Sequence, residues 1–177
     1  MTPATPDTSA RPQRLVTWAD VHGDARALVR ALLARQPGGA AWKGIVAITR
    51  GGMVPAAVVA RELGLRVIDT LCIASYENDR QGTLRTVKLP RDAAAERGAG
   101  WILIDDIVDT GATARAARDL LPEALFCALY LKPDGRGTAD LFVHEVAQDV
   151  WVHFPWDTAE AGGALAYAPP LAAEAGR

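Results

Sequence analysis

The sequence predicts an α/β protein built on an open, mostly parallel twisted sheet that is flanked by helices. Three observations predict this fold. Short apolar runs of the buried-strand type alternate with segments of helical periodicity. The apolar run at 101–104 leads directly into acidic residues and a Thr/Gly turn, which is typical of a ligand site at the carboxyl end of a parallel strand. The chain has 177 residues and is 50% apolar, which is enough for one compact core.

The N-terminal segment lacks the pattern of a folded element. Residues 1–13 contain three prolines and no periodicity, so we expect a disordered arm before a single domain at 14–177. Thr17 and Asp20 have the spacing of a capping box, and apolar residues follow at helical spacing. This pattern predicts the first helix over about residues 18–35.

The remaining elements alternate along the chain. Helices are expected from about Pro55 to Gly64 and from the turn at 110–113 to Leu121, whereas the polar stretch 75–88 predicts a hairpin-like excursion. Strands are predicted at 44–48, 66–74, 101–104, 125–131 and 141–146. Side chains expected to serve packing are Trp18, Trp42, Trp101, Cys72 and Cys127, and those expected at the surface or at sheet edges are His22, His144 and His153.

Charge and hydropathy exclude several classes of protein. The chain has 19 Lys and Arg against 21 Asp and Glu, and the net charge of -2 leaves no basic field for non-specific binding of nucleic acid. No apolar stretch approaches the ~20 residues that span a bilayer, and residues 1–14 have no apolar signal-peptide centre. We therefore expect a cytoplasmic protein that binds no nucleic acid.

Residues 102–114, with the sequence ILIDDIVDTGATA, are the most informative stretch of the chain. A Thr/Gly turn at the start of a helix offers a phosphate backbone N–H groups, hydroxyls and the positive end of the helix dipole. The three carboxylates of Asp105, Asp106 and Asp109 would repel that phosphate unless they faced sugar hydroxyls or a magnesium ion. The pattern therefore predicts a sugar phosphate as the ligand.

This stretch closely resembles the 5-phosphoribosyl-1-pyrophosphate (PRPP) signature of the type I phosphoribosyltransferases, and Thr49–Gly52 resembles that family's pyrophosphate loop. The resemblance implies that Asp105 and Asp106 contact the ribose hydroxyls and hold Mg²⁺, with Asp106 the stronger candidate for the metal. It implies a C-terminal hood over the base at about 148–171. The implied PRPP-binding residues are Arg50, Gly51, Asp105, Asp106, Ile107, Val108, Asp109, Thr110, Gly111, Ala112 and Thr113.

The likeness covers residues 14–171 and is strongest to the bacterial xanthine-guanine branch of the family, through the segments 42–45, 74–76, 131–133 and 151–157. It implies that Lys132 donates to the purine 6-oxygen, that Trp151 stacks on the base, and that the Val152 backbone meets the group at position 2. Asp109 would lie near N7 as the catalytic acid or base. The implied activity is the magnesium-dependent transfer of the phosphoribosyl group from PRPP to guanine or xanthine, in purine salvage.

One departure and several alternatives stay open. Gly82 stands where the relative has an Arg that reaches pyrophosphate, and Arg80 or Arg85 is the candidate substitute. Ala112 replaces a Gly of the relative. A hypoxanthine-preferring enzyme and a PRPP- or nucleotide-sensing regulator are the alternative functions. The resemblance further implies a homo-oligomer, either a dimer or a tetramer, and a peripheral position on the inner membrane as an alternative to the free cytoplasm.

Overall fold

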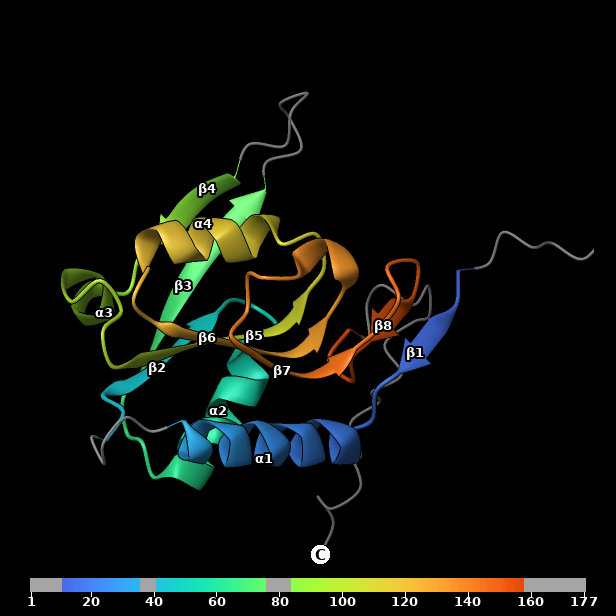
Figure 1. The fold of residues 1–177 in the computed structure, drawn as a ribbon, viewed down its shortest axis with the longest axis horizontal. Coiled ribbons are helices and arrows are strands. Elements are labelled where there is room, and N and C mark those ends of the chain that lie inside the picture. The colour runs from blue at the N-terminus through green and yellow to red at the C-terminus, as the bar shows by residue number, and fades with distance from the viewer. Residues whose placement is uncertain (1–10, 36–40, 76–83, 158–177) are drawn as a thin grey trace, which may run out of the picture.

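The computed structural model describes residues 11–35, 41–75 and 84–157, and its centre is a six-stranded sheet in the order β4-β3-β2-β5-β6-β7 (Figure 1). All neighbouring pairs are parallel except β3 and β4, which form an antiparallel hairpin. The strands are β2 (Gly44–Ile48), β3 (Ile68–Ser75), β4 (Leu84–Lys88), β5 (Trp101–Val108), β6 (Leu125–Leu131) and β7 (Leu141–Glu145). The predicted open, mostly parallel sheet is therefore confirmed.

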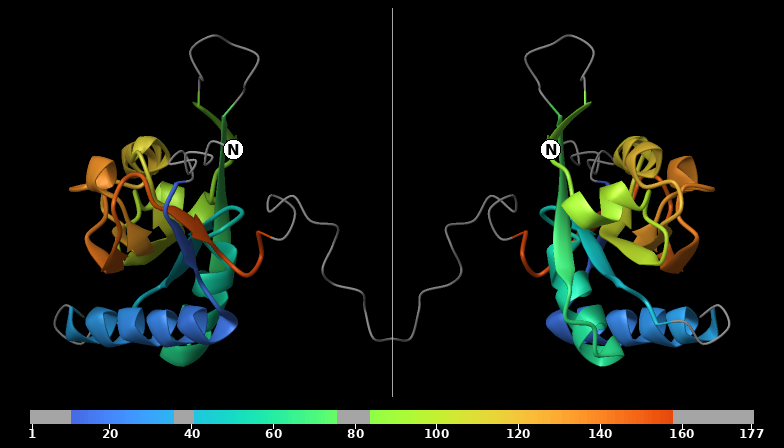
Figure 2. Two further views of the ribbon diagram at one scale, coloured as in Figure 1. Left: turned by 90° about the vertical axis from the view of Figure 1, so that its right-hand side faces the viewer. Right: turned by 90° about the vertical axis from the view of Figure 1, so that its left-hand side faces the viewer.

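Helices cover both faces of this sheet (Figures 1 and 2). Helices α1 (Trp18–Ala34) and α2 (Met53–Leu63) lie on one face, and α3 (Arg91–Ala95) and α4 (Ala112–Leu120) pack against the other. Strand residues alternate between the two cores: Ile102 and Ile104 belong to the core under α1 and α2, whereas Leu103 belongs to the core under α4. The alternation explains why the central strands are apolar on both sides.

Local signals fix the ends of the first two helices. The Thr17 hydroxyl accepts from the Asp20 N–H at 3.1 Å, and the Asp20 carboxylate accepts from the Thr17 N–H at 2.9 Å, so the predicted capping box is confirmed. Helix α2 begins two residues before Pro55, which therefore occupies its first turn. It ends at Gly64, whose φ of 71° lies in the left-handed region that glycine tolerates.

A second, two-stranded sheet joins the two ends of the described chain. Strand β1 (Gln13–Leu15) pairs in parallel with β8 (Trp151–His153), and Gln13 lies opposite Trp151. Gln13, the last residue of the predicted arm, is thus the first residue of a strand, while residues 1–10 lie outside the described part of the chain. The predicted hood at about 148–171 is described only as far as Asp157.

Three further expectations from the sequence differ from the structure. Strand β5 does not end at Ile104 but continues through the two acids to Val108, because its pairing with β6 runs on to Leu131. Trp18 was assigned to packing but is 58% exposed, and only the ring of Trp156 lies beside it among the described aromatic residues. Cys72 is half-buried rather than a full core residue, whereas Cys127 is buried as predicted.

Within the described ranges, no helix combines the length and the apolar character needed to cross a membrane.

The order of the strands creates a switch point between β2 and β5. From β2 the chain crosses through α2 to β3 on one side, and from β5 it crosses through α4 to β6 on the opposite side. The loops that follow β2 and β5 therefore diverge, and the space between them lies at the carboxyl ends of the strands. This is the position at which open α/β sheets bind their ligands.

Candidate active site

The loop after β2 lies directly against the end of β5. A Cβ added at Gly51 would come within 2.5 Å of Oδ1 of Asp106, and closer still to Oδ2. A Cβ at Gly52 would come within 2.7 Å of the Ile48 carbonyl oxygen. Because only glycine leaves room for this approach, the pair Gly51-Gly52 brings the backbone of the loop and the Asp106 carboxylate together.

A cleft of about 510 Å³ opens where these groups meet. It brings together three residues predicted from the sequence, Arg50, Gly51 and Asp106, and adds apolar and acidic groups that were given no role in the site. Its lining residues are Arg50, Gly51, Met53, Val54, Asp106, Trp156 and Asp157. The Trp156 ring is held by stacking on Phe154, with ring centroids 4.7 Å apart, and the Asp157 carboxylate accepts from the Phe154 N–H at 2.9 Å.

The two adjacent acids at the end of β5 are held by their own backbone. The Asp105 carboxylate accepts from the Asp106 N–H at 3.0 Å, and the Asp106 carboxylate accepts from the Ile107 N–H at 2.7 Å. Burial raises the pKa of Asp105 well above its usual value, and the neighbouring Asp106 charge raises it further. Burial also raises the pKa of Asp106, with a smaller contribution from the Asp157 charge. Burial and the neighbouring acids therefore make it unfavourable for both carboxyl groups to be ionised together.

This donor set fits a hard divalent cation. Among the described residues no cluster of three or more His, Cys, Asp or Glu side chains forms a complete metal cage. Mg²⁺ does not need one, since it is usually bound by one or two carboxylates together with water and substrate phosphate oxygens. Asp105 and Asp106 supply two such carboxylates, and their raised pKa values indicate that a positive charge beside them would be favourable.

A second, smaller hollow of about 110 Å³ lies over the turn that opens α4. Gly111 adopts a φ of 76°, and the Arg115 guanidinium donates to the Thr110 carbonyl at 3.0 Å, which shapes the turn from its far side. The residues of the first turn of α4 line this hollow, and because the first N–H groups of a helix have no partner within it, such a turn suits an anion. The residues that line it are Asp105, Ile107, Val108, Asp109, Thr110, Gly111, Ala112, Thr113 and Ala114, so the predicted phosphate-binding run is brought together at one place.

Lys132 and Asp109 meet across the ends of β5 and β6. The Lys132 side chain is only 6% exposed, and its Nζ lies 3.0 Å from Oδ2 of Asp109, whose side chain is 49% exposed. The Lys132 N–H donates to the Val108 carbonyl at 2.9 Å. Gly135 allows the 133–135 turn to close over this corner, since a Cβ there would come within 2.5 Å of the Val108 side chain. Lys132 is therefore a buried, ion-paired side chain and not a solvated lysine of a loop.

Gln148 joins this pair and was not found by sequence reasoning. Its Nε2 donates to Oδ1 of Asp109 at 2.7 Å. The partners are 39 positions apart, and no short motif links them. Only the return of the chain after β7 toward β8 brings Gln148 to Asp109.

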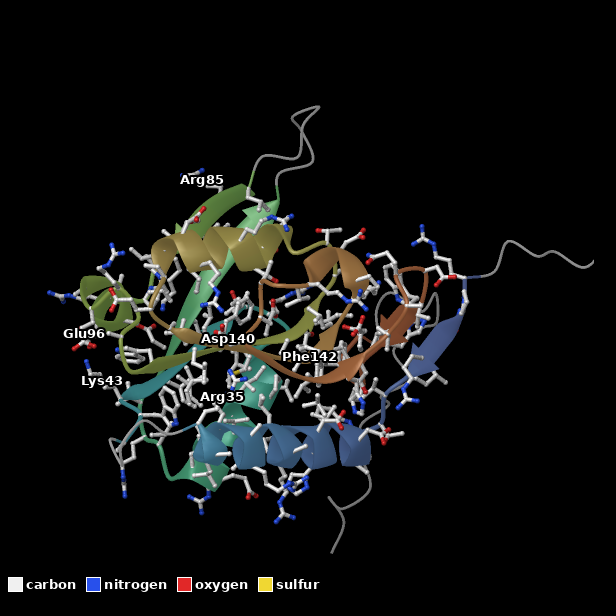
Figure 3. The ribbon with its side chains drawn as sticks, viewed as in Figure 1. Arg35, Lys43, Arg85, Glu96, Asp140 and Phe142 are labelled. Atoms are coloured by element: carbon white, nitrogen blue, oxygen red, sulfur yellow. The ribbon has the colours of Figure 1, made fainter. Side chains whose placement is uncertain are left out.

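The remaining predicted residues that the structure describes, like Lys132, do not line either hollow. Trp151 is 41% exposed on β8 and Val152 is buried, and neither is among the described residues that line either hollow. Arg85 lies exposed on β4 (Figure 3) and does not line the hollows either. Arg80 and Gly82 lie outside the described residues, so the choice between Arg80 and Arg85 remains a prediction.

Comparisons with known proteins identify relatives of this chain. A family profile described as the phosphoribosyl transferase domain matches residues 25–161. The chain is 50% identical over 159 residues to the xanthine-guanine phosphoribosyltransferase of Chromohalobacter salexigens, covering 90% of each chain. It is also 50% identical over 143 residues to the xanthine-guanine phosphoribosyltransferase of Nitratidesulfovibrio vulgaris, covering 81% of this chain and 83% of the relative.

Solved structures share the fold at lower sequence identity. A purine phosphoribosyltransferase from Pyrococcus horikoshii superimposes with a TM-score of 0.69 at 22% identity, covering 82% of this chain and 94% of the other. The xanthine-guanine-hypoxanthine phosphoribosyltransferase of Helicobacter pylori gives a TM-score of 0.67 at 22% identity, with the same two shares covered. At this identity the likeness establishes the architecture alone.

Proposed function

The chain belongs to the phosphoribosyl transferase family, and we propose that it transfers the 5-phosphoribosyl group of PRPP to N9 of guanine or xanthine, which releases pyrophosphate. The observation that carries the proposal is the convergence of three features at one edge of the sheet, next to the switch point between β2 and β5. An acid pair, a phosphate cradle and a Lys132–Asp109 pair all lie at the carboxyl ends of β5 and β6. Together they offer a group for each part of a ribose phosphate and a purine base.

The proposed contacts to the phosphates and the ribose of PRPP follow from the positions of the charged groups. The turn at 110–113 would hold the 5-phosphate through N–H groups and hydroxyls, and Asp105 and Asp106 would accept from the ribose hydroxyls. Arg50 and the Gly51 backbone line the larger cleft, where they would balance the negative charge that grows on the departing pyrophosphate. Mg²⁺, held by Asp106 and Asp105, would supply further positive charge to the phosphate oxygens.

The base side follows from the Lys132–Asp109 pair. A lysine can only donate, so Lys132 would select the 6-oxo group of guanine, xanthine or hypoxanthine and would leave the 6-amino group of adenine unpaired. Asp109 would face N7 and hold or remove a proton there. The exposed ring of Trp151 offers a stacking surface, and the Val152 backbone would contact the group at position 2.

Initial rates with four bases test this proposal most directly. Purified protein, PRPP and Mg²⁺ are combined with guanine, xanthine, hypoxanthine or adenine, and nucleotide formation is followed. We expect guanine and xanthine to react fastest, hypoxanthine more slowly and adenine at least about 10⁴-fold more slowly, because the Lys132 donor has no acceptor there. A chelator should abolish the reaction. A preference for hypoxanthine would overturn the base assignment, and no nucleotide from any base would overturn the enzymatic function in favour of a nucleotide-sensing role.

We also propose that the protein forms a homo-oligomer, either a dimer or a tetramer. Leu15 and Trp18 lie three positions apart and both stay exposed on one chain, and exposed apolar surface of this kind often marks a contact between subunits. Sedimentation of the full chain at micromolar concentration should give a mass at least twice that of one chain. A single-chain mass under those conditions would contradict the proposal.

A further inference from the structure

Gln148 makes two hydrogen bonds that run in opposite directions. Its Nε2 donates to Oδ1 of Asp109 at 2.7 Å, and its Oε1 accepts from the Asp134 N–H at 3.0 Å. The residue lies in the turn between β7 and β8 and is half-buried. It therefore links this turn to the end of β5 and to the turn that follows Lys132.

The two bonds leave the amide only one orientation. A backbone N–H can donate only to the oxygen of the side-chain amide, and a carboxylate can accept only from the nitrogen of that amide. Turning the amide over would place oxygen against oxygen at Asp109 and hydrogen against hydrogen at Asp134. The backbone of Asp134 thus determines that Gln148 presents a donor to Asp109.

Asp109 is consequently held by a donor at each of its two oxygens. Lys132 Nζ approaches Oδ2 at 3.0 Å and Gln148 approaches Oδ1 at 2.7 Å. With Lys132 alone, the half-exposed carboxylate could rotate about its Cβ–Cγ bond, since that torsion is broad for Asp. The second donor fixes the plane of the carboxylate. Each oxygen has two acceptor directions, so a free direction remains at each for a substrate N–H.

We propose that Gln148 is a positioning residue, which holds the Asp109 carboxylate in the plane from which it meets the N7 side of the purine. This inference rests on the proposed function. An amide suits the role because it donates without adding a second positive charge beside Lys132, which would weaken the carboxylate as a proton acceptor. Gln148 lines neither hollow, and its role in the reaction would be exerted through Asp109.

Two substitutions at Gln148 separate positioning from simple support of the turn. Gln148→Ala removes both bonds, and we expect kcat/KM for guanine to fall about 10-fold to 100-fold, as for loss of a hydrogen bond to a charged group. Gln148→Glu keeps the acceptor for the Asp134 N–H but sets a second carboxylate against Asp109. Its activity relative to the wild type should therefore rise as the pH is lowered and the new side chain becomes protonated, which allows it to donate.

A double-mutant cycle tests whether Gln148 acts through Asp109. In an Asp109→Ala background, Gln148→Ala should lower the remaining rate less than twofold. The control Asp149→Ala changes an exposed neighbour in the same turn and should leave the rate unchanged. The proposal is overturned if Gln148→Ala has the same effect with and without Asp109, or if Gln148→Glu follows the wild-type pH profile.

Unfolding measurements keep this test separate from the proposed function. If the wild type makes no nucleotide from any base, the transferase proposal fails whatever Gln148 does. The wild type, the two single alanine variants and the double variant of this cycle are then compared by urea unfolding without substrate, where a held carboxylate predicts favourable coupling between Gln148 and Asp109. A coupling of zero would show that the two side chains do not interact in solution, and would overturn the inference on its own.

Discussion

Gly51→Ala is the sharpest test of how the two loops are joined. A Cβ at this position would lie 2.5 Å from Oδ1 of Asp106, whereas ordinary van der Waals contact begins at about 3.4 Å. The Asp106 carboxylate or the loop must therefore move by at least about 1 Å, and the approach to Oδ2 is tighter still. A misplacement of about 1 Å in a positioned catalytic group can lower the rate about 100-fold. We expect kcat/KM for PRPP to fall by about that factor or more.

The fold should survive this substitution. Gly51 does not have a positive φ, so alanine brings no backbone strain, and the atoms that must give way are the end of a side chain. The displaced carboxylate would lose its bond from the Ile107 N–H, which costs about 1 to 2 kcal/mol of unfolding free energy. Thermal unfolding and nucleotide formation are measured on the same sample.

Gly23→Ala is the matched control for Gly51→Ala. Gly23 lies within α1, and a Cβ there meets nothing within 4 Å. This variant should keep full activity and gain up to about 1 kcal/mol of stability, because alanine favours the helix. If Gly51→Ala retained kcat/KM within threefold of the wild type, the close approach of the β2 loop to Asp106 would not be needed for catalysis.

Three further predictions address the acids and the base side. Burial raises the pKa of Asp105 and of Asp106, so at pH values above the ordinary pKa of Asp the native state binds more protons than the unfolded chain. The free energy of unfolding that this pair contributes is therefore greatest at acid pH and is lost as the pH rises through the raised pKa values. Asp106→Asn should therefore raise the melting temperature relative to the wild type by a few degrees at pH 8 without metal, and by less at pH 4; an equal change at both pH values would contradict this. Lys132→Met should raise KM for guanine at least about 10-fold while KM for PRPP stays within twofold, and a parallel rise in both would place Lys132 elsewhere in the reaction. Trp151→Ala should weaken guanine binding about 10-fold to 100-fold in a calorimetric titration with little change in melting temperature, since the ring is 41% exposed, and unchanged affinity would remove its stacking role.

Local patterns predicted the parts of the site that lie close together in the sequence. The acid pair and the Thr/Gly turn follow one another along β5 and into α4, so strand, turn and helix signals place them without any long-range contact. The extension of β5 through Asp105 and Asp106 was missed because paired carboxylates are unusual in a strand. Here each accepts from the next backbone N–H, which satisfies the acids while the pairing with β6 continues to Val108.

Features that depend on distant partners could not be predicted in the same way. Gln148 shows no local signal, because its role depends on Asp109, 39 positions away, and on the fold of the turn between β7 and β8. Trp18 has the residue type of a core side chain, yet its place at the first position of α1 leaves it 58% exposed. Strand β1 has only three residues, all exposed, and becomes recognisable as a strand only through its partner β8.

The pairing of β1 with β8 also determines when each half of the site can be completed during protein synthesis. The ribosome releases β1 before the strands of the large sheet, whereas its partner at 151–153 emerges only after all of those strands have been made. The phosphate cradle, by contrast, needs only the segments up to α4 and their neighbours in the sheet. A growing chain can therefore build its sugar-phosphate half early, while the strand that carries Trp151 is secured later, by a segment made long before it.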